Sequence, residues 1–350
     1  MFFFERPRWK TVEYSRSEII NAGRIIKKDE STSEQIVQAT KVIDNWRAAH
    51  AYPLHVFYMH LRRMASNRTE IVVAERLKRL DSITNKLRRE PNMSLWTMQD
   101  LGGCRLVVPS VKDVYWYANK YRNSRIRHRP VSEYDYILSP KRSGYRSLHL
   151  VFEYHSDTNE FYNKNMLVEL QFRTHLQHLW ATAVETMGLF TKQALKAGQG
   201  NEDIIRFFAL VSSLFALKEG TPVVPGTSED ALILISDIKE INDREHILDI
   251  LSAIRVAVEH KSGSEFGSQG YYILILNYNT RKLNIKYFKP SQSDEASTTY
   301  AQIEGTRAES QIDAVLVSVS SFQALRAAYP NYFSDIGDFI ETVRTDLLLY

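Results

Sequence analysis

The stretch Tyr134–Glu185 decides the fold, because it passes from a polar loop to a strand and then to a helix. The loop reads YDYILSPKRSGYRSLH over residues 134–149. The segment MLVELQFR at 166–173 alternates apolar and polar residues, as a half-buried strand does. The segment HLQHLWATAVETM at 175–187 then changes to helical spacing. Together they predict an α/β fold with a polar working surface at its centre.

The polar side chains of this stretch are of the types that bind phosphate and nucleobases. The loop places Lys141, Arg142 and Arg146 around Tyr145, whose ring we expect to offer a flat face to a base. A tyrosine packed in the core is the plainer alternative. One face of the strand carries an acid, an amide and a guanidinium: Glu169, Gln171 and Arg173.

The flanking sequence extends the pattern into a mixed α/β sheet. The glycines at 102–103 precede a strand, a helix is expected at 111–121, and the next strand at 126–131. Residues 148–154 and 167–172 then read as a long hairpin. Upstream, the cations from Arg76 to Lys86 are spaced as on one helix.

The composition limits the class of protein. A chain of 350 residues with 44% hydrophobic residues is long enough for two compact domains, which we place at 1–225 and 226–350, joined near a Gly- and Pro-containing segment. The single cysteine, Cys104, excludes an intrachain disulfide and fits a reducing compartment. No apolar run is long enough to span a membrane. We expect a cytoplasmic protein with no membrane partner.

Charge is mildly basic overall, with a formal net charge of +4 and a pI near 8.9. The arginines nevertheless crowd just before the central loop, at Arg122, Arg125, Arg127 and Arg129. Such a run is usually a solvated face. Because it adjoins the candidate site, a contact with a polyanion is the alternative.

Several ordered motifs over residues 70–190 resemble the synthetase domain of the RelA/SpoT family of pyrophosphokinases. The central motifs are DYI at 135–137, PK at 140–141, GYRSLH at 144–149 and VELQFRT at 168–174. Upstream, DLGGCR at 100–105 is similar to the family's Asp-x-x-Gly-x-Arg. The resemblance implies a nucleotidyltransferase-like sheet with flanking helices.

The resemblance also implies roles for individual residues. ATP would be held by cations and a hydroxyl: Arg76, Lys78, Arg79, Ser82, Lys86 and Arg105. The acceptor would be surrounded by Lys141, Tyr145, His149, Gln171, Arg173 and His178. His178 departs from the asparagine of some small synthetases, which leaves the identity of the acceptor open.

Two carboxylates are candidates for the catalytic and metal-binding groups. Asp100 and Glu169 each lie at the end of, or within, a strand that borders the central loop, so both are placed to hold Mg²⁺. Taken alone, two acids on strands are more often ordinary surface groups. The resemblance implies that they bind Mg²⁺ and that Glu169 assists deprotonation of the acceptor hydroxyl.

Three functions are compatible with these motifs. The first is a pyrophosphokinase that transfers pyrophosphate from ATP to the 3′-hydroxyl of tRNA and so blocks translation. The alternative is an alarmone synthetase that uses GDP or GTP as the acceptor. A catalytically dead nucleotide-binding module is the third, and the intact Asp100, Glu169 and Arg105 argue against it.

The tail favours the tRNA enzyme. A helix is expected at 243–259, a hairpin at 270–288, a polar loop at 289–310 and a strand at 313–319. Near the end, Tyr329 and Tyr332 form a Tyr-x-x-Tyr element that resembles the neutralising motif of CapRel-type fused toxins and antitoxins. The resemblance implies a pseudo-zinc-finger-like domain that inhibits the active site, and antiphage defence in which a phage protein such as capsid relieves the block. Alone, the element is a helix-ending turn with two aromatics.

Overall fold

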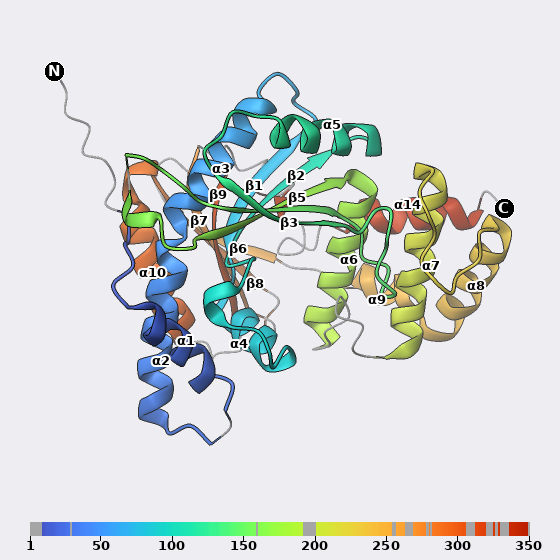
Figure 1. The fold of residues 1–350 in the computed structure, drawn as a ribbon. Coiled ribbons are helices and arrows are strands. Elements are labelled where there is room, and N and C mark those ends of the chain that lie inside the picture. The colour runs from blue at the N-terminus through green and yellow to red at the C-terminus, as the bar shows by residue number, and fades with distance from the viewer. Residues whose placement is uncertain are drawn as a thin grey trace.

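Strands from both halves of the chain form one nine-stranded sheet (Figure 1). The strand order is β3-β4-β5-β2-β1-β9-β7-β8-β6. This computed structural model describes residues 9–28, 30–158, 160–191, 201–253, 257–262, 269–277, 280, 282–305, 312–319, 325, 328–329 and 336–348.

The strands within these residues are β1 (Val72–Leu77), β2 (Gly102–Val108), β3 (Arg129–Asp135), β4 (Leu148–Glu153), β5 (Leu167–Thr174), β6 (Ala257–Ser262), β7 (Gly270–Asn277), β8 (Lys282–Phe288) and β9 (Ile312–Val319). The α-helices are α1 (Arg16–Ile25), α2 (Ser33–Ala49), α3 (Ala51–Met64), α4 (Leu80–Arg89), α5 (Val111–Arg122), α6 (His175–Thr191), α7 (Glu202–Glu219), α8 (Ala231–Glu245), α9 (Ile247–Ala253), α10 (Ser293–Gly305) and α14 (Gly337–Leu348). Short 3₁₀ helices lie at Leu95–Thr97, Glu160–Tyr162 and Pro290–Gln292.

The alternating segment at 166–173 forms β5, in the middle of the five N-terminal strands of the sheet. It pairs antiparallel with β4 and parallel with β2, so that Glu169 lies beside Val151 on one side and Gly103 on the other. Val168, Leu170 and Phe172 are fully buried, while Glu169 and Gln171 are only partly buried on the other face. The predicted α/β class and the predicted alternation are therefore confirmed.

The helices of the chain belong to two separate hydrophobic cores. The apolar side chains of α3 and α5 pack on one face of β1, β2, β4 and β5 and form a single core with α1 and α2 (Figure 1). Beside β5 and β2, helices α6, α7, α8, α9 and α14 share a second core. The face of the sheet opposite α3 and α5 is left to carry polar groups.

The two halves of the chain are joined by packing as well as by the connection near Gly220 and Gly226, which both have positive φ. Strand β9 pairs antiparallel with β1, and Phe339 of α14 contacts Phe208 and Phe215 of α7. The division at residue 225 stays a prediction, but the sheet continues across it.

Three segments differ from the expectation. Residues 76–86 are not one helix: β1 runs to Leu77, where it is held between β2 and β9, and α4 begins at Leu80. The helix expected at 243–259 is divided between α8 and α9 and ends before β6, because His246 adopts a left-handed conformation that ends α8. The polar loop expected at 289–310 contains α10, whose Ala296 and Tyr300 are buried against the sheet.

Candidate functional site

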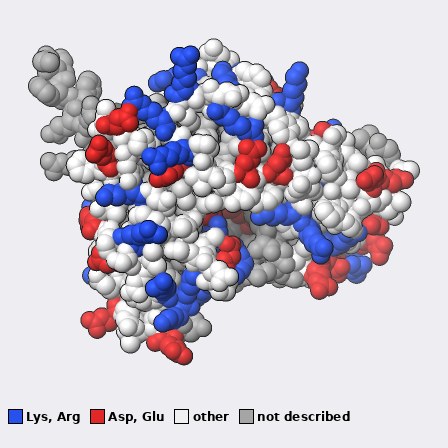
Figure 2. Space-filling view, in the orientation of Figure 1, with Lys and Arg blue, Asp and Glu red and all other residues white. Residues whose placement is uncertain are grey.

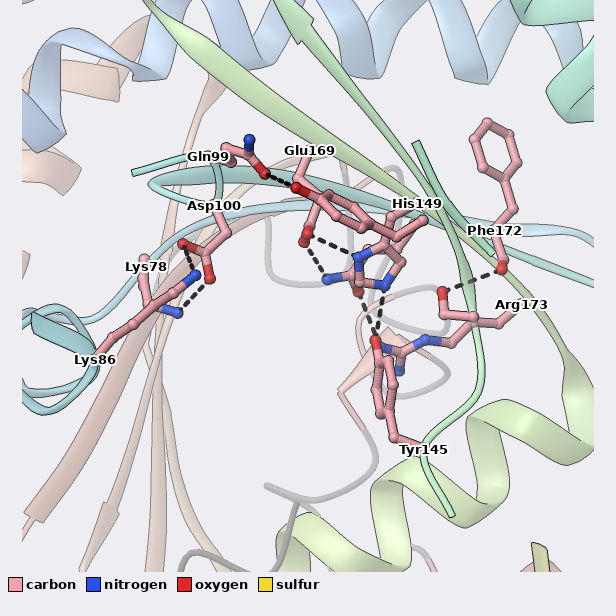
Figure 3. A network of polar contacts seen from close by, with 12 residues as sticks. Lys78, Lys86, Gln99, Asp100, Tyr145, His149, Glu169, Phe172 and Arg173 are labelled. Atoms are coloured by element: carbon pink, nitrogen blue, oxygen red, sulfur yellow. Dashed lines mark hydrogen bonds and ion pairs between the residues drawn. The ribbon is translucent and has the colours of Figure 1, made fainter. Parts of the chain in front are cut away.

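A cavity of about 170 Å³ lies on the polar face of the sheet, where β1, β2 and β5 meet (Figure 3). Its walls combine charged groups from the N-terminal half with one tyrosine from the tail. The lining residues are Ala74, Arg76, Lys78, Asp100, Gly103, Cys104, Arg105, Tyr145, Glu169, Gln171, Arg173 and Tyr329. Figure 2 shows the molecule hollowed at its centre, with Lys and Arg side chains on both sides of the hollow.

Asp100 is held between two lysines. Lys78 Nζ donates to Oδ2 at 2.8 Å, and Lys86 Nζ donates to Oδ1 at 3.0 Å (Figure 3). Burial opposes the charged form of Asp100, but the two ammonium groups outweigh it and hold the pKa of this carboxyl well below its usual range. Asp100 is therefore ionised at neutral pH.

Glu169 belongs to a second network, centred on His149. The Nδ1 of His149 lies 2.8 Å from Glu169 Oε1, and Gln171 Nε2 donates to Oε2 at 2.6 Å. Burial acts against both charges, yet the neighbouring Tyr145 hydroxyl and Glu169 carboxylate raise the pKa of His149 to about 9, and His149 lowers the pKa of Glu169. The pair is an imidazolium and a carboxylate at neutral pH.

Tyr145 does not present the open face that the sequence suggested. Its side chain is 9% exposed and packs with α6 and α7. Its hydroxyl accepts from Arg173 Nη2 at 2.6 Å and lies 2.9 Å from His149 Nε2, while the Arg173 guanidinium lies 5.1 Å from the ring centroid. In this state the tyrosine joins His149 to Arg173.

Two guanidinium groups at the cavity have buried N–H groups that meet no hydrogen-bond partner among the described residues. These are Nε of Arg105 and both Nε and Nη1 of Arg173. Burial and the nearby Arg173 and Arg76 lower the pKa of Arg105 to about 10. Buried donors of this kind need acceptors, and phosphate oxygens are the best match for a guanidinium fork. The cavity is therefore suited to a polyphosphate.

The remaining predicted residues lie around this cavity rather than in it. Arg79 and Arg76 both face Glu185 of α6, at 3.3 and 3.9 Å, which ties the start of α4 to α6. The sequence placed Glu185 on the polar face of its helix without assigning it a role. The predicted site residues that do not line the cavity are Arg79, Ser82, Lys86, Lys141, His149 and His178.

Tyr329 of the tail reaches the cavity wall. It is 3% exposed, and its hydroxyl donates to the backbone oxygen of Glu75 at 3.0 Å. Next to it, Arg105 Nη1 donates to the backbone oxygen of Ala328 at 3.1 Å. The second tyrosine of the predicted element, Tyr332, lies outside the described residues.

Sequence reasoning missed Glu75, Gln99 and Tyr136. Glu75 is buried on β1, and His55 Nδ1 lies 3.0 Å from its carboxylate. The signal available in the sequence was an acidic residue that directly follows apolar strand residues and precedes Arg76. Gln99 precedes Asp100 and accepts from the Tyr134 hydroxyl at 3.2 Å. Tyr136 belongs to the quoted DYI motif but received no role.

A family model matches the part of the chain that contains most of this site. Residues 75–193 match the model of the region found in RelA / SpoT proteins. The chain carries a RelA/SpoT region. All the predicted site residues except the two tail tyrosines lie within it.

Relatives of the RelA/SpoT region include two curated proteins of Bacillus subtilis (strain 168). GTP pyrophosphokinase YjbM is 38% identical over 112 residues, covering 31% of this chain and 52% of the relative. GTP pyrophosphokinase YwaC is 33% identical over 117 residues, with the same coverage of 31% and 52%. The chain thus spans about half the length of the curated relatives it matches. The solved small alarmone synthetase 1 from Bacillus subtilis, bound to its product pppGpp, aligns at 26% identity and a TM-score of 0.41, over 48% of this chain and 88% of that chain.

The carboxylates of the RelA/SpoT region fit a magnesium ion. Asp100 and Glu169 line the same cavity, both are ionised, and their charges interact. Magnesium in phosphoryl-transfer sites usually takes one or two carboxylates and completes its shell with phosphate oxygens and water. Lys78 and Lys86 each donate to one oxygen of Asp100, so a bound ion would share these oxygens with the ammonium groups or displace one of them.

No helix among the described residues is long and apolar enough to cross a membrane.

Proposed function

We propose that the chain transfers pyrophosphate from ATP to a ribose hydroxyl of a second substrate. The observation that carries this proposal is one cavity that combines two ionised carboxylates, Asp100 and Glu169, with the incompletely paired guanidinium groups of Arg105 and Arg173. Such a set of charges suits a triphosphate and a divalent ion better than any neutral ligand. The relatives named GTP pyrophosphokinase support the same reaction class.

In this mechanism the acceptor oxygen attacks the β-phosphorus of ATP. A new O–P bond forms, the bond between the β-phosphorus and the α,β-bridging oxygen breaks, and AMP leaves with that oxygen. Glu169 accepts the hydroxyl proton, while His149 and Gln171 hold its carboxylate in place. Arg105, Arg173 and the lysines on Asp100 orient the phosphates. Magnesium bound by Asp100 and Glu169 would neutralise phosphate oxygens as charge develops on them.

The proposed acceptor is the 3′-hydroxyl of tRNA, so the product would block translation. The arginines at 122–129 support this less than the sequence suggested, because Arg122 pairs with Glu133, Arg127 with Asp157 and Arg129 with Glu153. GDP or GTP is the second candidate acceptor, which the names of the relatives favour.

An assay with competing acceptors decides between these two. ATP labelled at the β-phosphate is incubated with the active enzyme, and tRNA, GDP and GTP are offered together. We expect label at the 3′ end of tRNA. Label found only in guanosine nucleotides would replace the tRNA proposal with the alarmone one.

We also propose that the C-terminal half inhibits this site in cis. Tyr329 supports the proposal, because it fills part of the cavity wall between Glu75 and Arg105 and would compete with a nucleotide there. A tethered inhibitor acts at an effective concentration of about the millimolar range, so weak contacts are sufficient to keep it bound in the site. Relief by a phage protein such as capsid, and a role in antiphage defence, belong to the same proposal and rest on the CapRel resemblance alone.

A further inference from the structure

Two aromatic rings lead from the surface toward the cavity. Tyr134 on β3 and Tyr136 just after it, here called the tyrosine strip, have parallel rings whose centroids are 5.9 Å apart with an interplanar angle of 2°. Tyr134 is 37% exposed and Tyr136 is partly buried. The Tyr136 ring is edge-on to the rings of Tyr145 and His149, at 5.8 and 5.3 Å. The aromatic surface is thus continuous from solvent to the catalytic network.

The tyrosine strip lies beside both carboxylates. The hydroxyl of Tyr134 is held by Gln99, the residue before Asp100 (Figure 3). The His149 ring that Tyr136 contacts is the one that binds Glu169. A base stacked on the strip would therefore lie next to the position where the acceptor hydroxyl reacts, beside Glu169.

The tyrosine strip also has a cation that is available to a phosphate. Lys141 Nζ lies 4.4 Å from the centroid of Tyr136 and 5.3 Å from that of Tyr145. Lys141 and its neighbour Arg142 are exposed, and within the described part of the chain no carboxylate pairs with either. The local acids are already engaged.

Those acids are Glu133 and Asp135. Glu133 accepts from Arg122 at 2.5 Å, and the two oxygens of Asp135 accept from the Tyr115 hydroxyl and from the backbone N–H groups of residues 137 and 138. The strip therefore presents two aromatic faces and positive charge. Aromatic rings beside cations are the usual surface for single-stranded nucleic acid, because bases stack on the rings while cations meet the phosphates.

We propose that the tyrosine strip and Lys141 bind the nucleotides that precede the reacting 3′-terminal nucleoside of a single-stranded RNA end. This inference rests on the proposed function, and it deepens it by naming the acceptor class as a chain of at least two nucleotides. A mononucleotide bound in the cavity has no second base to place on the strip. The strip would therefore separate a polynucleotide acceptor from GDP or GTP.

The test is a binding series with the full-length Glu169→Gln variant, without ATP. The ligands are a 5′-mononucleotide and oligoribonucleotides of two, three and four residues with the same 3′-terminal nucleoside. We expect the Kd to fall about tenfold between the mononucleotide and the longer ligands, the size of one base stack, and to rise with salt.

Variants of Tyr136 identify the strip as the cause of that length dependence. Adding Tyr136→Ala should remove most of the tenfold step, while Tyr136→Phe should keep it, because the ring does the stacking. Phe161→Ala, a change at another exposed aromatic that is 72% exposed, should leave the whole series unchanged. Equal affinity at every length, or an equal loss for mononucleotide and oligonucleotides in Tyr136→Ala, would overturn the inference.

Binding and transfer can fail separately. A length step that depends on Tyr136 supports the strip even when no acceptor receives label from ATP, in which case the proposed reaction alone is wrong. Labelled tRNA with no length step means that the reaction stands and the strip is wrong.

Discussion

At the residue scale, the cavity depends on how each charge is compensated. Asp100 keeps its charge through two lysines, and Glu169 keeps its charge through a histidine and an amide. Both carboxylates are thus ready to meet a cation. Arg105 and Arg173, in contrast, have N–H donors that no described residue engages, so a ligand at this site is expected to bring acceptors.

The first prediction concerns these carboxylates. Asp100→Asn or Glu169→Gln should reduce AMP release from ATP by at least a thousandfold, since losing a charged metal ligand costs several kcal/mol and about 1.4 kcal/mol is already tenfold. Glu153→Gln, at a partly exposed acid on the neighbouring strand, is the matched control and should keep activity. Release at the wild-type rate in a folded Asp100→Asn or Glu169→Gln variant would contradict the assignment.

The second prediction is a pH dependence of stability. The pKa of His149 is raised from 6.5 to about 9, so the stabilisation from its charge is complete below pH 6.5 and is lost as the pH rises through 9. The free energy of unfolding of the wild type relative to His149→Gln should therefore shrink by about 3 kcal/mol between pH 6 and pH 10. Urea titrations of both proteins measure it. A difference that stays constant with pH would mean that the pKa of His149 is the same in the folded and unfolded states.

At the scale of elements, the sequence predicted most of the helices and strands of the RelA/SpoT region. The alternation in β5, the hairpin of β4 and β5, and helix α5 were readable because each buries a regular apolar pattern. The tail was harder to predict. Helix α10 buries only a few residues and is rich in Ser, Thr and acids, so local composition indicated a loop, although contacts with the sheet make it a helix.

At single residues of the site, too, the sequence could not predict features that depend on contacts with distant segments. The resemblance to the RelA/SpoT motifs assigned roles to Asp100, Glu169, Arg105 and Arg173, and all four line one cavity. It could not show that Tyr145 is buried, because the helices that cover it come from later in the chain.

The third prediction concerns the contact between α2 and α10. Arg47 of α2 donates to Glu304 of α10 at 2.5 Å, both side chains are 4% exposed, and Tyr300 also donates to Glu304 at 2.7 Å. Arg47→Ala leaves a buried carboxylate without its cation and should destabilise the protein by about 3–5 kcal/mol.

The double change Arg47→Met with Glu304→Leu should restore most of that loss, because it removes both charges and keeps the volume. Thermal unfolding of the three proteins measures the effect. Equal melting temperatures for wild type and Arg47→Ala would show that the pair does not hold α10.

At the scale of the whole molecule, the tail is integrated into the fold as well as placed over the site. Strand β9 pairs with β1, and α14 packs on α7. Truncation after residue 226, the direct way to remove an inhibitor, would expose one edge of β1 and the apolar surface of α7. A point change in the tail is the better test.

The fourth prediction is that Tyr329→Ala in the full-length chain activates the enzyme. Losing the hydroxyl contact with Glu75 and the ring at the cavity should open the site, raise AMP release about tenfold or more, and make expression toxic to cells. Adding Glu169→Gln should abolish the toxicity. If the folded Tyr329→Ala protein is as inactive and harmless as the wild type, the tail is structural and not an inhibitor.

Strand β9 pairs with β1 in the sheet but is synthesised much later than β1. Strand β1 is synthesised early, whereas β9 and Tyr329 come after the RelA/SpoT region has left the ribosome. At about 5–20 residues per second, translation of residues 194–329 takes on the order of ten seconds. Each new molecule therefore passes through a period in which Asp100 and Glu169 exist without β9 and Tyr329. Under the proposed inhibition in cis, the order of synthesis leaves each new chain uninhibited during this interval.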